Sequence, residues 1–137
     1  MENMSTKIYS KNTIDITTFF GGPLGGIYMM YKNYINFGNR AAAKKLLTNG
    51  LIITAVFYGV YSFVPYDIAK KLVYVIPLIP FAVIHYYMTK TQVSEIDLHI
   101  KNGGKTFSGW SGFGIFIVSI ILQLVYVMII QSFFVSA

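Results

Sequence analysis

The chain has 137 residues, of which 55% are hydrophobic, 17% aromatic and only 12% charged, whereas an ordinary soluble domain carries about 25% charged residues. A soluble domain of this length could not bury so many apolar residues in its core, so the composition predicts a single domain surrounded by lipid. Eleven Lys and Arg against five Asp and Glu give a net charge of +6, and there is no cysteine. The basic residues lie in short segments between apolar runs, which favours contact with anionic lipids over nucleic acid, and disulfides and a cysteine nucleophile are excluded.

The first predicted element is a helix over about residues 14–37, which contains the stretch FFGGPLGGIYMMY. Glycine and proline are more frequent in membrane helices than in soluble ones, and neighbouring helices can satisfy the backbone groups that Pro23 frees. Gly38 is a natural C-terminal stop. The residues therefore predict a first transmembrane helix.

Four glycines in this element suggest close packing: Gly21, Gly22, Gly25 and Gly26. Their spacing matches neither a dinucleotide fingerprint nor a Walker loop, and no cleavage site for a signal peptide follows. They do form two overlapping four-residue repeats, which would line one helix face with small residues against a partner helix. The alternative is a locally broken helix whose exposed backbone groups bind an ion or a substrate.

Two further apolar runs predict transmembrane helices over residues 46–64 and 68–88. Only Pro65, Tyr66 and Asp67 separate them, so the two helices are expected to be antiparallel neighbours. Pro77 and Pro80 are expected to kink the second of them.

The segment 89–109 is the only sizeable polar region, and Asn102-Gly103-Gly104 predicts the stop of a short helix within it. Ser108 is a plausible N-cap for the last apolar run, residues 113–135, which has 23 residues and no charge. The sequence therefore predicts an all-α membrane protein with four transmembrane helices and a short cytoplasmic helical segment between the third and fourth.

The positions of Lys and Arg predict the orientation in a bacterial inner (plasma) membrane. Residues 32–45 carry Lys32, Arg40, Lys44 and Lys45, and residues 89–109 carry three more lysines. By the positive-inside rule both segments are cytoplasmic and both termini lie outside. If the first segment does not cross the membrane, only the N-terminus moves inside.

Three polar residues within the apolar runs form a candidate polar path: Asp15, His85 and Gln123. An ionisable residue inside a membrane segment is a functional hypothesis by default, although Asp15 could instead cap the first helix. Gln123 could equally serve as an interhelical hydrogen-bond partner. No arrangement of residues specifies catalysis, and we expect no cofactor or metal site, because the carboxylates and histidine of Glu95, Asp97 and His99 would spread around a helix axis.

The stretches FFGGPLGGIYMMYKNYINFG and GGKTFSGW together resemble a group of small bacterial membrane proteins. In that group a GGPxxGG first helix is followed by a basic turn, two spans and a GGKxxSxW segment before the last span. The resemblance covers most of the chain. It implies an architecture and no activity, so it assigns no functional residue.

The sequence favours a non-enzymatic integral membrane protein that acts through helix–helix contacts, as a homo-oligomer or as an accessory subunit of a larger complex. The expected partners are the bilayer, including anionic lipids, and a second copy or another membrane protein. The alternative is a small transporter or channel with the polar path named above. A third hypothesis is a cytoplasmic docking surface that includes Asn33, Asn36, Asn39 and Arg40.

Overall fold

The computed structural model of the protein describes residues 5–135. Over this range the chain forms seven α-helices and is all-α, as the hydrophobic patterns predict. The helices are α1 (Lys11–Gly21), α2 (Pro23–Asn36), α3 (Arg40–Ser62), α4 (Tyr66–Leu72), α5 (Leu78–Thr91), α6 (Val93–Lys101) and α7 (Gly109–Val135). A single β-bridge joins Ile8 to Thr106.

The prediction of four transmembrane helices, and with it the multi-pass location, was wrong. Among the helices of residues 5–135, only α7 is long and apolar enough to cross a membrane, judged by length and composition. Crossing a hydrocarbon layer of about 30 Å takes about 20 apolar residues. The last predicted span, residues 113–135, lies within α7 and meets this requirement, but the other three do not.

The first predicted span is broken into two short helices at Gly22. This residue has a φ of +80°, which an α-helix does not contain, so the chain reverses there and α2 packs back against α1. With 11 and 14 residues, α1 and α2 are about 16 Å and 21 Å long. Each is too short to cross a hydrocarbon layer alone, and together they form a helical hairpin.

The other two predicted spans fail for different physical reasons. Residues 46–62 of the second predicted span lie in α3, which begins with the basic turns of Arg40, Lys44 and Lys45 and ends at Ser62, so its apolar part is shorter than the stretch of about 20 residues that a crossing needs. Residues 68–88 are divided between α4 and α5 by a turn over residues 73–77. Pro77 is the last residue of this turn and the N-cap of α5; proline is poorly tolerated in the interior of a helix, because it lacks an N–H and clashes with the carbonyl of the preceding turn.

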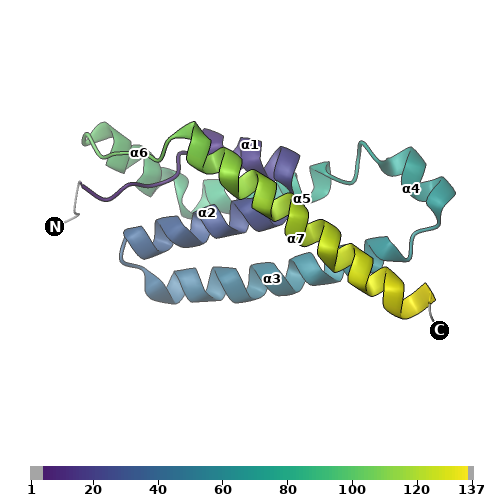
Figure 1. The fold of residues 1–137 in the computed structure, drawn as a ribbon. Coiled ribbons are helices and arrows are strands. Elements are labelled where there is room, and N and C mark those ends of the chain that lie inside the picture. The colour runs from purple at the N-terminus through teal and green to yellow at the C-terminus, as the bar shows by residue number, and fades with distance from the viewer. Residues whose placement is uncertain (1–4, 136–137) are drawn as a thin grey trace.

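The hairpin places the N-terminal segment beside both basic connections. Figure 1 shows residues 5–10, the α2–α3 connection and α6 at one end of the molecule, and α4 and the end of α7 at the other. We call the first the basic end, because it holds every Lys and Arg of the chain except Lys70 and Lys71 in α4. Residues 5–10 lie beside the basic connections because the chain turns back at Gly22, which is the arrangement expected if the first segment does not cross the membrane.

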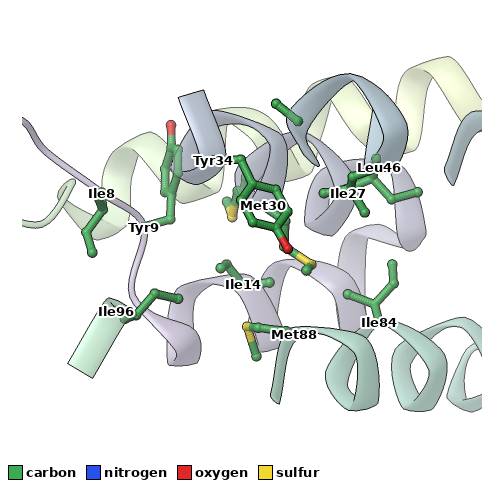
Figure 2. Packing of buried hydrophobic residues seen from close by; sticks show 12 residues of the cluster. Ile8, Tyr9, Ile14, Ile27, Met30, Tyr34, Leu46, Ile84, Met88 and Ile96 are labelled. Atoms are coloured by element: carbon green, nitrogen blue, oxygen red, sulfur yellow. The ribbon is translucent and has the colours of Figure 1, made fainter. Parts of the chain in front are cut away.

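The hydrophobic core lies toward the basic end. Figure 2 shows side chains from α1, α2, α3, α5 and α6 meeting there, together with Ile8 and Tyr9 of the N-terminal segment. Burying a large aliphatic side chain contributes about 1.5–3 kcal/mol, so this cluster holds the short helices together. The fully buried members are Ile8, Ile14, Met29, Ala43, Met88 and Ile96.

The opposite end of the molecule, which we call the apolar end, has a hydrophobic surface. It comprises the second half of α3, α4, residues 73–79 and the second half of α7, and its exposed side chains include Val56, Val60, Phe63, Tyr66, Tyr74, Val75, Leu124, Met128 and Phe133. In α7, only 11% of the most apolar window of 18 residues is buried. Monomeric soluble proteins rarely expose contiguous apolar patches of more than a few hundred Å². We therefore expect this surface to contact lipid or another protein.

Candidate functional site

The turn at Gly22 is held by polar side chains of α7. The carbonyl oxygen of Gly21 accepts hydrogen bonds from Ser119 Oγ at 2.9 Å and from Gln123 Nε2 at 2.6 Å. The same Ser119 hydroxyl accepts a hydrogen bond from the backbone N–H of Gly25 at 2.9 Å. One residue pair on α7 therefore contacts the end of α1 and the beginning of α2.

These contacts decide what the broken helix does chemically. A break in an apolar environment is tolerated when other parts of the protein satisfy the backbone groups that it frees. Here Ser119 and Gln123 take up the Gly21 carbonyl, while Gly22 N–H donates to Thr18 O at 3.0 Å. The Gly21 carbonyl thus fastens α7 to the hairpin and is not presented to an ion or a substrate.

All four glycines of the GGPLGG stretch lie at contacts between helices of this chain. A Cβ atom added at Gly25 would lie 2.7 Å from Thr17 Cγ2, and one added at Gly26 would overlap Thr18 Oγ1. These two glycines therefore let α2 approach α1. A Cβ at Gly21 would lie 2.9 Å from Phe116 Cδ2 of α7, and one at Gly26 would also lie 3.2 Å from Ile84 Cγ2 of α5. The glycines therefore contact several neighbouring helices rather than a single partner helix.

Two of the three residues of the candidate polar path are paired. His85 Nδ1 of α5 lies 2.9 Å from Asp15 Oδ1 of α1, and 3.0 Å from Oδ2. The N-cap of α1 is Ser10, which accepts a hydrogen bond from Thr13 N–H, so Asp15 does not cap the helix. Gln123 lies elsewhere, at the Gly22 turn, and the three residues do not form one path.

The N-terminal segment is fixed by an asparagine whose role the sequence did not reveal. Asn33 of α2 is fully buried; its Oδ1 accepts from Tyr9 N–H at 2.7 Å and its Nδ2 donates to Tyr9 O at 2.9 Å. Asn36 Nδ2 donates to Lys7 O at 2.6 Å. Asn33 and Asn36, beside Lys32, predicted part of a docking surface, but the fully buried Asn33 is not available for docking.

The segment before α7 completes this arrangement. Ile8 N–H donates to Lys105 O, and Phe107 N–H donates to Ile8 O. The Tyr9 and Phe107 rings stack with centroids 4.4 Å apart. The N-terminal segment, α2 and the start of α7 are thereby held together at the basic end.

The basic end carries little compensating negative charge. Its four predicted flank residues are Lys32, which is half-buried, and Arg40, Lys44 and Lys45, which are exposed. Within the part of the chain that the structure describes, the one lysine paired with a carboxylate is Lys11, whose Nζ lies 3.6 Å from Asp97 Oδ1. The surface is therefore electropositive and suited to anionic groups.

An elongated groove lies between α3 and α5, with α2 as its floor. Its volume is about 370 Å³, and its apolar lining comes from Pro23, Ile27, Met30, Leu46, Gly50, Ile53, Phe57, Ile79, Pro80, Val83 and Ile84. Figure 2 shows Ile27 and Leu46 on one side and Ile84 on the other. Lys45, Asn49, Thr54 and Tyr87 also line it.

The comparisons with known proteins assign no relative. No protein-family model, curated protein or solved structure matches this chain significantly.

Proposed function

We propose that the protein is a non-enzymatic integral membrane protein, anchored by α7, that acts through helix–helix contacts as a homo-oligomer or as an accessory subunit of a larger complex. The observation that carries this proposal is the exposure of α7, a helix of 27 residues that is about 40 Å long and little buried by the rest of the chain. Lipid and a partner helix are the two surroundings that suit such a surface.

The contacts of α7 support placing more than this one helix in the membrane. Gln123 lies 14 residues after Gly109, about 21 Å along the helix, and it bonds to Gly21 at the tip of the hairpin. If α7 crosses the bilayer, the Gly22 turn lies near the middle of the hydrocarbon layer. The hairpin α1–α2 then enters from the basic end and returns to it, as a re-entrant segment supported by protein.

The charge distribution supports one orientation. The basic end holds nine of the eleven Lys and Arg residues, and such residues are enriched on the cytoplasmic side of membrane proteins. In a bacterial plasma membrane, the basic end, with residues 32–45 and 89–109, would then be cytoplasmic and the C-terminus outside.

We propose that this chain is homologous to the small bacterial membrane proteins that it resembles. Both of its glycine motifs lie where the backbone needs glycine, since Gly22 and Gly103 each have a φ of +80°. A Cβ at Gly104 would overlap the His99 ring. The motifs are thus conformational requirements of this fold, which is a reason for related chains to share them.

Membrane fractionation followed by chemical crosslinking tests the proposal. We expect the protein in the membrane fraction after alkaline extraction, and, after gentle solubilisation, crosslinks to a second copy or to another membrane protein. Recovery in the soluble fraction would contradict the membrane anchor. A membrane-bound protein that crosslinks to nothing would contradict the role in assembly.

A transporter or channel is the second candidate, and the contact between Asp15 and His85 is the observation that favours it. An ionisable pair between two helices is a feature of proton and ion paths. Flux measured in proteoliposomes should then fall on substitution of Asp15→Asn or His85→Gln. Flux that does not depend on either residue would remove this candidate.

A further inference from the structure

We propose that the groove between α3 and α5 binds one anionic membrane lipid, with an acyl chain along the apolar lining and the phosphate at Lys45 and Asn49. The inference rests on the proposed membrane location, because a lipid must reach the groove from the bilayer. It adds a ligand and a binding residue to that proposal.

The lining is mostly apolar with Lys45 as its charged residue, which suits an anionic amphiphile. Lys45 and Phe57 both line the groove and are 12 residues apart in α3, so the groove runs for about 18 Å along the helix. Lys45 and Asn49 lie toward the basic end, and Pro23 and Phe57 lie toward the Gly22 turn. A volume of about 370 Å³ falls within the range of about 300–1,000 Å³ for small-molecule sites.

The narrow groove suits a single extended acyl chain. Gly50 contributes to the narrow shape, since a Cβ there would lie 2.9 Å from Ile27 Cδ1 on the floor.

Charge complementarity selects an anionic head group. Lys45 is exposed, and within residues 5–135 it forms no ion pair, because the two pairs present join Lys11 to Asp97 and His85 to Asp15. A lysine near an anionic lipid surface contributes about 1 kcal/mol. The ammonium group of Lys45 and the side-chain amide of Asn49 together offer donors to phosphate oxygens.

Native mass spectrometry of the full chain, purified from membranes in detergent, tests this inference. The chain is titrated with phosphatidylglycerol and with phosphatidylcholine of the same acyl chains. We expect one phosphatidylglycerol per chain, bound at least fivefold more tightly than phosphatidylcholine. Lys45→Gln should remove about that fivefold preference, the equivalent of 1 kcal/mol, whereas Lys44→Gln, a neighbouring exposed lysine outside the groove, should retain it.

Variants that fill the groove show whether the lipid binds in the groove or on the outer surface of the protein. Ile53→Trp should weaken binding of both lipids at least tenfold, while Ile52→Trp, on the same helix and similarly exposed but outside the lining, should bind like the wild type. Val83→Trp repeats the test from the opposite wall, and circular dichroism shows that each variant retains its helices.

Three outcomes would overturn the inference. They are equal affinity for the two lipids, equal effects of Lys45→Gln and Lys44→Gln, and unchanged binding in both groove-filling variants. A protein found in the membrane fraction with any of these outcomes contradicts the lipid site alone. A protein found in the soluble fraction contradicts both the site and the proposed function.

Discussion

Gly22 is the residue on which the hairpin depends most directly. Its backbone angles, φ +80° and ψ −178°, lie in a region that is essentially restricted to glycine and costs other residues about 1–3 kcal/mol. Gln123 also occupies the position that a Cβ would take. The turn therefore requires glycine for conformation and for space.

We predict that Gly22→Ala lowers the free energy of unfolding by more than Gly38→Ala does. Gly38 also has a positive φ, +82°, but a Cβ there meets nothing within 4 Å, so its substitution costs only the conformational strain of about 1–2 kcal/mol. Thermal unfolding in detergent, followed by circular dichroism, measures both. Equal losses in the two variants would show that the contact with Gln123 does not matter.

Ser119 illustrates how one hydroxyl can serve two helices. We expect Ser119→Ala to cost about 1–3 kcal/mol, because it leaves the Gly25 N–H without a partner in an apolar environment. Ser132→Ala, whose hydroxyl bonds only within its own exposed turn of α7, is the matched control and should cost much less. Similar losses for both would argue against the role of Ser119 in fastening α7 to the hairpin.

Asn33 is a residue-scale feature that periodicity could not assign. An asparagine in a helix surrounded by apolar residues can face lipid, a partner helix or its own chain, and only the fold decides which. We predict that Asn33→Leu releases the N-terminal segment, because Tyr9 loses both backbone hydrogen bonds. Faster hydrogen exchange at residues 7–10, with unchanged exchange in α7, would be the expected result; unchanged protection at 7–10 would contradict it.

At the scale of the helices, the contact between Asp15 and His85 joins α1 to α5. We predict a coupling of about 0.5–1 kcal/mol between the two side chains, since the pair is partly exposed to its surroundings. A double-mutant cycle with Asp15→Asn and His85→Gln in thermal unfolding measures it. Additive effects of the two substitutions would mean that the pair does not stabilise the packing of α5.

The helices differ in how far their sequences determined them. The uncharged run from Phe113 to Val135 predicted α7 because length and apolarity alone specify such a helix. The prediction of one continuous helix over residues 14–37 was wrong, because glycine and proline are compatible both with a continuous membrane helix and with a hairpin turn. The reversal at Gly22 is stabilised by Ser119 and Gln123, about a hundred residues away. The local sequence pattern gives no information about contacts at that separation.

The candidate site was predictable to a similar degree. Asp15 and His85 were recognisable as ionisable residues in apolar runs, and the structure pairs them across 70 residues of sequence. Their pairing could not be inferred, because it depends on how α5 packs against α1. The groove could not be anticipated either, since its lining comes from three helices whose relative placement no periodicity encodes.

At the scale of the whole molecule, positive charge and exposed apolar surface are separated from each other. Positive charge is concentrated at the basic end, and exposed apolar side chains cover the apolar end and α7. The turn at Gly22 explains why residues 5–10 share the basic end with both polar connections. With α7 in the membrane, as proposed, we expect the N-terminus and residues 89–109 on the same side.

Labelling of single cysteines with a membrane-impermeant maleimide tests this claim most directly, because the natural chain has no cysteine. Lys7→Cys and Asn102→Cys are exposed positions at the basic end, and a cysteine added after Ala137 reports the other terminus. In intact bacterial cells only the C-terminal cysteine should react, and in inverted vesicles Lys7→Cys and Asn102→Cys should both react. Labelling of Lys7→Cys in intact cells, with Asn102→Cys protected, would contradict the re-entrant hairpin.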